Sequence, residues 1–119
     1  MATRHQSRTV VVSLLYAYDV GNENIESFSE DILEDKKIRN KQKEFALKLF
    51  NGTIKHLNFI DEKIEKHLKE WSLNRLGSME RSILRLAAYE IIIEKTNEAI
   101  IINEALELSK EFASDQSPK

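Results

Sequence analysis

The chain has 119 residues, which is enough for one domain and not comfortably for two. Hydrophobic residues make up 41% of it, and 18 basic against 20 acidic residues leave a net charge of −2, which excludes a uniformly basic nucleic-acid coat. The chain contains no cysteine, so disulfide scaffolds, thiol catalysis and cysteine zinc sites are excluded as well.

Turn-forming residues are scarce, with three glycines and one proline in the whole chain. An all-β protein of this length would need many turns, which usually draw on glycine and proline. No apolar run reaches the roughly 18–20 residues that a membrane helix needs, and the first residues are not typical of a signal peptide. We therefore expect one all-α domain over residues 1–119, with no membrane contact and a cytoplasmic location.

The first predicted helix spans residues 3–20 and ends before Gly21, where a residue with positive φ is expected. Ser27 is followed three residues later by Glu30, a capping-box pattern that predicts a short helix over 28–35. The lysine-rich residues 36–43 are either a loop or the polar start of the next helix.

Apolar residues at intervals of three and four then predict a helix over residues 39–57 that contains Gly52. A break near Asn58 separates it from a helix whose apolar stripe ends at Trp71. Residues 72–77 form a connection with room for one helical turn.

Two further helices are predicted in the last third of the chain. Ser78 is expected to cap a helix over 79–94, which is apolar on most of its circumference and should lie at the centre of the molecule. The last helix should begin at Thr96 or Asn97 and run to residue 113.

Positive charge gathers at the start of the first helix. Arg4, His5 and Arg8 all precede the first acidic residue, Asp19, and the two arginines are spaced to share one helix face. Cations at a helix N-terminus oppose the helix dipole, whereas the same amides and guanidinium groups suit a bound phosphate. The pattern fits an RNA or phosphate site, with a polar leader of no consequence as the alternative.

No catalytic or metal-binding pattern is present. None of the three histidines follows a glutamate at the spacing of di-iron bundles, and no Walker, HExxH or GxSxG motif occurs. The glutamates of the last two helices are expected on solvated faces or at caps. We predict no enzyme activity, no metal and no cofactor.

Three segments resemble the NusB family of bacterial transcription antitermination factors. They are the Arg-x-x-x-Arg start followed by residues 14–18 (LLYAY), residues 76–90 (LGSMERSILRLAAYE) and residues 102–112 (INEALELSKEF). The resemblance implies an all-α fold of two packed small helical bundles. It also implies binding of single-stranded boxA RNA from ribosomal RNA transcripts, together with NusE, in a complex that helps RNA polymerase to resist termination.

The resemblance also assigns residues to two sites. RNA binding is expected at Arg4, His5, Arg8, Gln116 and Lys119, and NusE binding at Tyr16, Glu80 and Arg81. The family normally continues past the position of Lys119 into a final helix, so this chain is expected to lack that helix. Its absence would expose apolar surface and favour a homodimer.

Two other functions remain open. The same fold occurs as the RNA-recognition region of certain ribosomal RNA cytosine methyltransferases, of which this chain would be a fragment. The other is a helical protein–protein adaptor that binds no RNA. Salt dependence separates an RNA binder from an adaptor. Each phosphate contact to a single strand contributes about −0.7 to the slope of the logarithm of the binding constant against the logarithm of the salt concentration.

Overall fold

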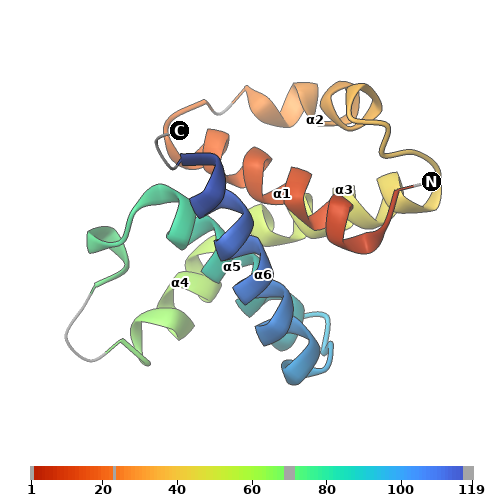
Figure 1. Cartoon of the computed structure of the whole chain (residues 1–119). Coiled ribbons are helices and arrows are strands. Elements are labelled where there is room, and N and C mark those ends of the chain that lie inside the picture. Colours follow the sequence, from red (N-terminus) through yellow and green to blue (C-terminus); the bar gives the residue numbers. More distant parts are fainter. Residues whose placement is uncertain (1, 23, 69–71, 117–119) are drawn as a thin grey trace.

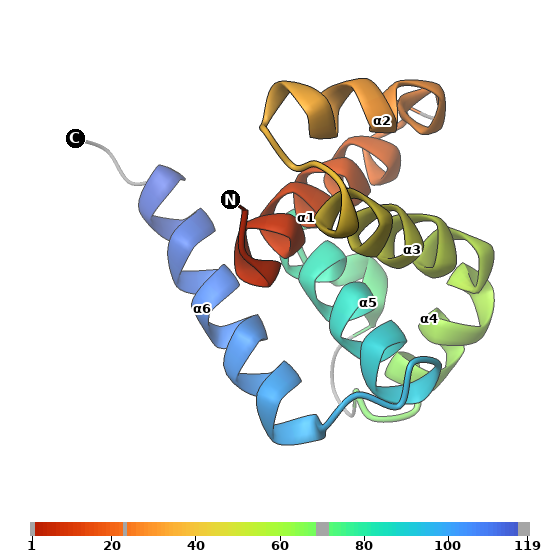
Figure 2. The same ribbon diagram turned by 90° about the vertical axis from the view of Figure 1, so that its right-hand side faces the viewer.

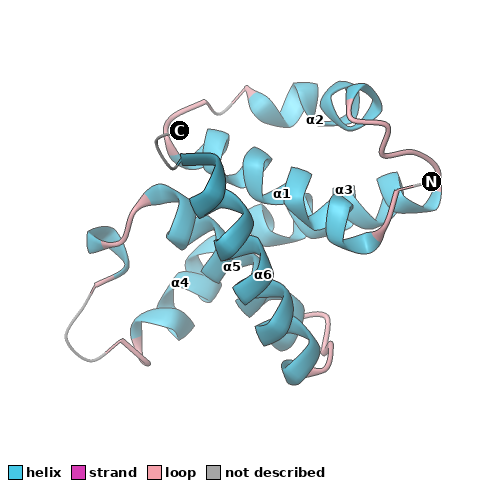
Figure 3. Cartoon of the chain, in the orientation of Figure 1, coloured by secondary structure: helices cyan, strands magenta, loops and turns pink. Residues whose placement is uncertain are grey.

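Six α-helices and one short 3₁₀ turn make up the regular structure of residues 2–22, 24–68 and 72–116, which the computed structural model describes (Figure 1). No strand occurs in these residues, so the all-α prediction is confirmed (Figure 3). The elements are α1 (Arg4–Asp19), α2 (Ile25–Asp35), α3 (Lys41–Lys55), α4 (Leu57–Glu65), the 3₁₀ turn η1 (Leu73–Arg75), α5 (Ser78–Ile92) and α6 (Glu98–Gln116).

The ends of α1 follow the chemistry of its sequence. Thr3 caps the helix by accepting a hydrogen bond from the Gln6 amide, and the Gln6 side chain accepts one from the Thr3 amide in return. After the helix, Gly21 has a φ of 107°, which a residue with a side chain rarely adopts. The predicted bounds of this helix and the conformation of Gly21 are thus confirmed.

Two predicted caps are wrong. α2 begins at Ile25, so Ser27 lies inside the helix instead of capping it. α5 begins at Ser78 with Gly77 at the cap position, and the Ser78 hydroxyl accepts a hydrogen bond from Arg81. In both cases a serine within the first turn imitates the sequence pattern of a cap. The predicted core position of Trp71 lies outside the described residues.

The helices form two groups that meet at α5. α1, α2 and α3 pack against one another, and α5 packs against α4 and α6 as well as against α1 and α3 (Figures 1 and 2). This arrangement confirms two small packed bundles, with α5 at the centre. All six helices contribute large, fully buried side chains to the core of the described residues: Val11, Val12, Leu14, Leu33, Leu49, Phe50, Ile60, Leu86 and Ile101.

Gly52 explains how closely α3 and α5 approach each other. The Tyr89 ring of α5 lies over the α-carbon of Gly52, so a β-carbon at this position would overlap the ring. The Tyr89 hydroxyl passes beyond the glycine and donates a 2.6 Å hydrogen bond to Glu94. Glycine within a helix costs about 1 kcal/mol relative to alanine, and here it admits the tyrosine.

None of the helices in the described parts of the chain is long and apolar enough to cross a lipid bilayer.

Candidate functional site

Arg4 is the exposed cation at the start of α1. Its guanidinium carbon lies 4.6 Å from the centre of the Phe45 ring of α3, a cation–π contact. The ring supports the side chain while leaving it open to solvent. Arg4 is therefore placed as the sequence predicted, on the surface beside the amides of the first helical turn.

Arg8 occupies a different environment from the predicted one. Its side chain is buried, and its Nε and Nη2 donate two 2.8 Å hydrogen bonds to the two carboxylate oxygens of Glu90 on α5. Glu90, predicted on a solvated face or at a cap, is buried as well, with 2% of its surface exposed. A buried charge is retained only when it is paired, so we assign Arg8 to the interior contact between α1 and α5 and not to an open phosphate site.

His5 joins the start of α1 to α6. Its Nδ1 lies 2.7 Å from a carboxylate oxygen of Glu104, and its Nε2 lies 2.6 Å from one of Glu111. Hydrogen bonds to Glu104 and then to Glu111 raise the pKa of His5 above its usual value. Only the protonated imidazole can donate from both nitrogens, so the geometry favours a positively charged His5 that holds α6 against α1.

A groove of about 430 Å³ opens beside this contact. Ala2, Gln6, Thr9 and Val10 of the N-terminal segment form one side, and the loop between α2 and α3 forms another. Glu111 of α6 completes the lining. Its carboxylate is held in place by His5 and by a hydrogen bond from the Thr9 hydroxyl.

The predicted C-terminal RNA residues lie near this groove along the chain. Gln116 is the last residue of α6, five residues after Glu111, and its side chain lies outside the described part of the structure. Lys119 lies outside the described residues. The structure thus joins His5 to α6, the helix that leads to Gln116, through Glu104 and Glu111, whereas Arg4 contacts Phe45 of α3.

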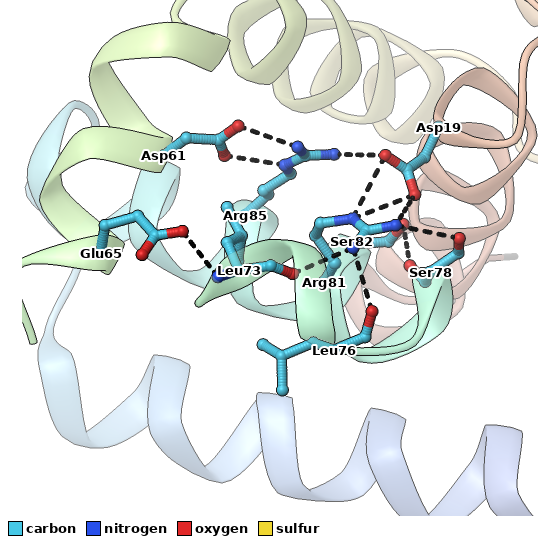
Figure 4. A network of polar contacts seen from close by, with 9 residues as sticks. All are labelled: Asp19, Asp61, Glu65, Leu73, Leu76, Ser78, Arg81, Ser82 and Arg85. Carbon is cyan, nitrogen blue, oxygen red and sulfur yellow. Dashed lines mark hydrogen bonds and ion pairs between the residues drawn. The ribbon is translucent and has the colours of Figure 1, made fainter. Parts of the chain in front are cut away.

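A second polar cluster lies at the other end of α1 (Figure 4). Asp19 there accepts hydrogen bonds from Arg81 Nη2 at 2.7 Å and from Arg85 Nη1 at 2.8 Å. Arg85 also binds both carboxylate oxygens of Asp61 on α4 at 2.8 Å. Burial alone would raise the pKa of Asp19, but the hydrogen bonds from Arg81 and Arg85 hold it below its usual value. The cluster therefore links α1, α4 and α5 through ion pairs.

Arg81 serves this cluster and not an open surface. Besides Asp19, its guanidinium donates to the carbonyl oxygens of Leu73 and Leu76, at 2.9 and 3.0 Å (Figure 4). The Leu73 amide in turn donates to Glu65 of α4 at 2.6 Å. This role differs from the predicted contact with a partner protein, because the guanidinium is already committed to fixing the connection between α4 and α5.

Tyr16 and Glu80 remain exposed on either side of this cluster. Tyr16 lies one helical turn before Asp19 and is 39% exposed, and Glu80 is the neighbour of Arg81. The Asp19–Arg81 ion pair joins the end of α1, which carries Tyr16, to the start of α5, which carries Glu80. Glu80 also lies at an apolar groove of about 510 Å³ between α4, α5 and α6, whose exposed side chains include Leu84, Ile102 and Leu106.

Some features of these sites could not be read from the sequence. The partners of Arg8 and His5 are glutamates 82 to 106 residues away, and helical periodicity does not indicate which distant carboxylate reaches a given cation. By contrast, Lys36 and Lys37, which line the groove, could have been noticed in the sequence, because they belong to the lysine-rich run of residues 36–43. Within the described residues, no group of three or more histidine, aspartate or glutamate side chains is placed to hold a metal ion.

Known proteins with similar sequences belong to one family. The sequence profile of the NusB family matches residues 5–119. The transcription antitermination protein NusB of a Nitratiruptor species is 60% identical over 119 residues, which span all of this chain and 86% of that protein. The NusB protein of Aliarcobacter butzleri is 61% identical over the same span and 91% of its own length.

Solved structures agree with these sequence matches. A crystal structure of the antitermination factors NusB and NusE in complex with dsRNA superimposes with a TM-score of 0.82 at 34% identity, over 92% of this chain and 82% of that one. A structure of T. maritima NusB gives a TM-score of 0.84 at 34% identity, over 93% and 79% of the two chains. These relatives are antitermination factors and not enzymes, and the chain belongs to the NusB family.

Proposed function

We propose that this chain is a transcription antitermination factor that binds single-stranded boxA RNA of ribosomal RNA transcripts together with NusE. The observation that carries the proposal is the division of α1 between two exposed sites. Arg4 stands at its start, on the Phe45 ring of α3, and Tyr16 stands near its end, one turn before the Asp19 cluster. Twelve residues separate them, which is about 18 Å along a helix, so RNA and a protein partner can bind at once.

The start of α1 supplies the RNA site in this proposal. Arg4 lies where the helix amides also attract anions, and it holds phosphates of the strand. His5, whose two ring nitrogens bind Glu104 and Glu111, contributes by fixing α6 against the start of α1. The bases of a single strand are free to splay and to be recognised by their edges. Arg8 contributes by fixing α1 against α5, and Gln116 and Lys119 extend the RNA site from the end of α6.

The end of α1 and the start of α5 supply the NusE site. The charged cluster around Asp19 holds Tyr16 and Glu80 in fixed relation, so that a partner meets a preorganised surface. NusE bound there adds contacts of its own to the same RNA strand. The resulting complex acts in the cytoplasm on RNA polymerase, helping it to resist termination.

The experiment is fluorescence anisotropy with a labelled boxA-type strand and a scrambled strand, with and without NusE, at several salt concentrations. We expect tighter and more selective binding of boxA when NusE is present, with affinity that falls as salt rises. Equal affinity for both strands in every condition would contradict the proposal.

One observation favours the second candidate, a helical adaptor without RNA binding. Two of the three cations at the start of α1 already have carboxylate partners within the chain, namely Arg8 and His5. An adaptor would bind NusE in the same experiment while leaving the anisotropy of either RNA unchanged. The full-length match to antitermination proteins supports RNA-dependent antitermination over a methyltransferase fragment.

Association between copies of the chain stays a prediction. Exposed apolar side chains on α6, Ile102 and Leu106 among them, are the surface that would favour it. Sedimentation velocity over a range of concentrations measures it directly, and a monomer at every concentration would contradict it.

A further inference from the structure

The loop between α2 and α3 is held in one conformation. The Ile38 amide donates to the Leu33 carbonyl at 2.8 Å and the Lys37 amide to the Glu34 carbonyl at 3.0 Å. These two bonds form the Schellman motif that ends many helices, and the Ile38 side chain is buried beneath it. The loop is therefore a fixed part of the surface.

Lys37 occupies the position in this motif that usually belongs to glycine. Its φ is 61°, in the left-handed region that a residue with a β-carbon adopts only at a cost. Asn40, three residues on, also has a positive φ, of 56°. Strained backbone of this kind is frequent at functional sites. Lys95 has a similar φ, and Lys37 differs from it by lining the groove beside the start of α1.

The charge of the loop is unevenly neutralised. Arg39 and Lys43 both bind Glu34, at 3.0 and 2.8 Å. Lys36 and Lys37 are exposed and make no ion pair within the described part of the chain. The loop thus presents two free ammonium groups on a protein whose net charge is negative.

Both lysines line the groove that the start of α1 borders. Gln6 and Thr9 lie on the α1 side of it, and the loop runs close to the start of α1 in both views (Figures 1 and 2). The groove, of about 430 Å³, falls within the range of cavities that hold small ligands, which is enough for one splayed nucleotide. The carboxylate of Glu111, which also lines the groove, is already bound by His5 and Thr9. The side of the groove formed by Lys36 and Lys37 is therefore free to bind an anion.

We propose that Lys36 and Lys37 form a second phosphate-binding wall, which carries the RNA strand from the start of α1 across this groove onto the α2–α3 loop. The inference rests on the proposed RNA-binding function and extends its site to a loop outside the residues that the family resemblance assigned. Because ammonium groups bind phosphate without reading base identity, this wall contributes affinity to boxA and scrambled strands alike.

The test uses Lys37→Gly, with Lys95→Gly as its matched control. Lys95 also has a positive φ, 59°, and is exposed. It belongs to the segment between α5 and α6, which lies apart from the α2–α3 loop in both views (Figures 1 and 2). Each substitution removes one positive charge and relieves the same backbone strain. Neither should lower the melting temperature, so a loss of binding cannot be attributed to unfolding.

Binding of both labelled strands is measured by anisotropy with NusE present. For Lys37→Gly we expect the salt slope to flatten by about 0.7, which corresponds to affinity about eightfold weaker at 50 mM salt and about threefold weaker at 200 mM. Lys36→Gln combined with Lys37→Gly should flatten the slope by about 1.4. Lys95→Gly should retain the wild-type slope.

The outcomes separate this inference from the function on which it rests. If Lys37→Gly bound RNA with the same affinity and salt slope as Lys95→Gly and the wild type, the loop site would be overturned and the proposed function would stand. A loss confined to the boxA strand would also overturn it, since the wall would then read bases. Wild-type protein that binds neither strand would overturn both.

Discussion

At the scale of single residues, the pairing of charges decides what each side chain of α1 can do. Arg4 rests on an aromatic ring and faces solvent, whereas Arg8, one turn later, is buried in a two-bonded pair with Glu90. The two arginines look equivalent in the sequence because they share a helix face. The structure separates them, because Arg8 is committed to the contact between α1 and α5 while Arg4 remains exposed for the proposed RNA binding.

The two roles predict opposite results for two alanine substitutions. Arg8→Ala leaves the Glu90 carboxylate buried without a partner and should lower the free energy of unfolding by about 3–5 kcal/mol. Arg4→Ala should leave stability nearly unchanged and flatten the salt slope of RNA binding by about 0.7. Chemical denaturation and anisotropy on both variants check this, and equal stability of the two variants would contradict the assignment.

His5 predicts a pH dependence of stability. Its pKa is raised in the folded protein by Glu104 and Glu111, so the contact contributes stability that is fully present below the unfolded pKa of about 6.5. That contribution is lost as the pH rises through the raised pKa. The melting temperature of His5→Gln should therefore fall below wild type at pH 6, and the gap should narrow at alkaline pH. A gap that is constant or widens with pH would show that His5 does not act through its charge.

At the scale of elements, α5 organises the molecule because helices of both bundles pack against it. It meets α3 at Gly52, α1 at the Arg8–Glu90 pair, and α1 and α4 together at Arg85. These contacts set the relative positions of the helix ends that carry the two proposed sites. Close packing at α5 is therefore the structural condition for both.

Gly52 offers a direct test of that packing. In an exposed helix, Gly→Ala usually stabilises by about 1 kcal/mol, but here the added methyl group would overlap the Tyr89 ring. We expect Gly52→Ala to lower the melting temperature. Asn51→Ala, at an exposed position of the same helix, should leave it unchanged or raise it. A stabilising Gly52→Ala would mean that α3 and α5 are not in close contact.

Helical periodicity predicted the elements well and the site only in part. The apolar spacing of α1, α3 and α6 gave bounds within a few residues, because each helix buries one continuous stripe. The capping residues of α2 and α5 were misassigned, since a serine in the first turn looks like a cap from sequence alone. The roles of Arg8 and Arg81 could not be predicted, because they depend on carboxylates and carbonyls brought close only by the fold.

At the scale of the whole molecule, the two proposed sites lie at opposite ends of one helix, α1. The Asp19 cluster fixes the end near Tyr16 and Glu80, and the His5 contact fixes the start against α6. Such an arrangement lets a protein partner and an RNA strand be held at a constant separation. It also predicts that each site can be disabled without the other.

That separation is tested most directly by RNA anisotropy on Arg4→Ala and Glu80→Lys, each with and without NusE. We predict that Arg4→Ala weakens RNA binding in both conditions while NusE still binds. Glu80→Lys should abolish only the gain in RNA affinity that NusE provides, with the melting temperature nearly unchanged because the side chain is exposed. If Glu80→Lys retained the full gain from NusE, or if Arg4→Ala bound RNA like wild type, the assignment of the two ends of α1 would be wrong.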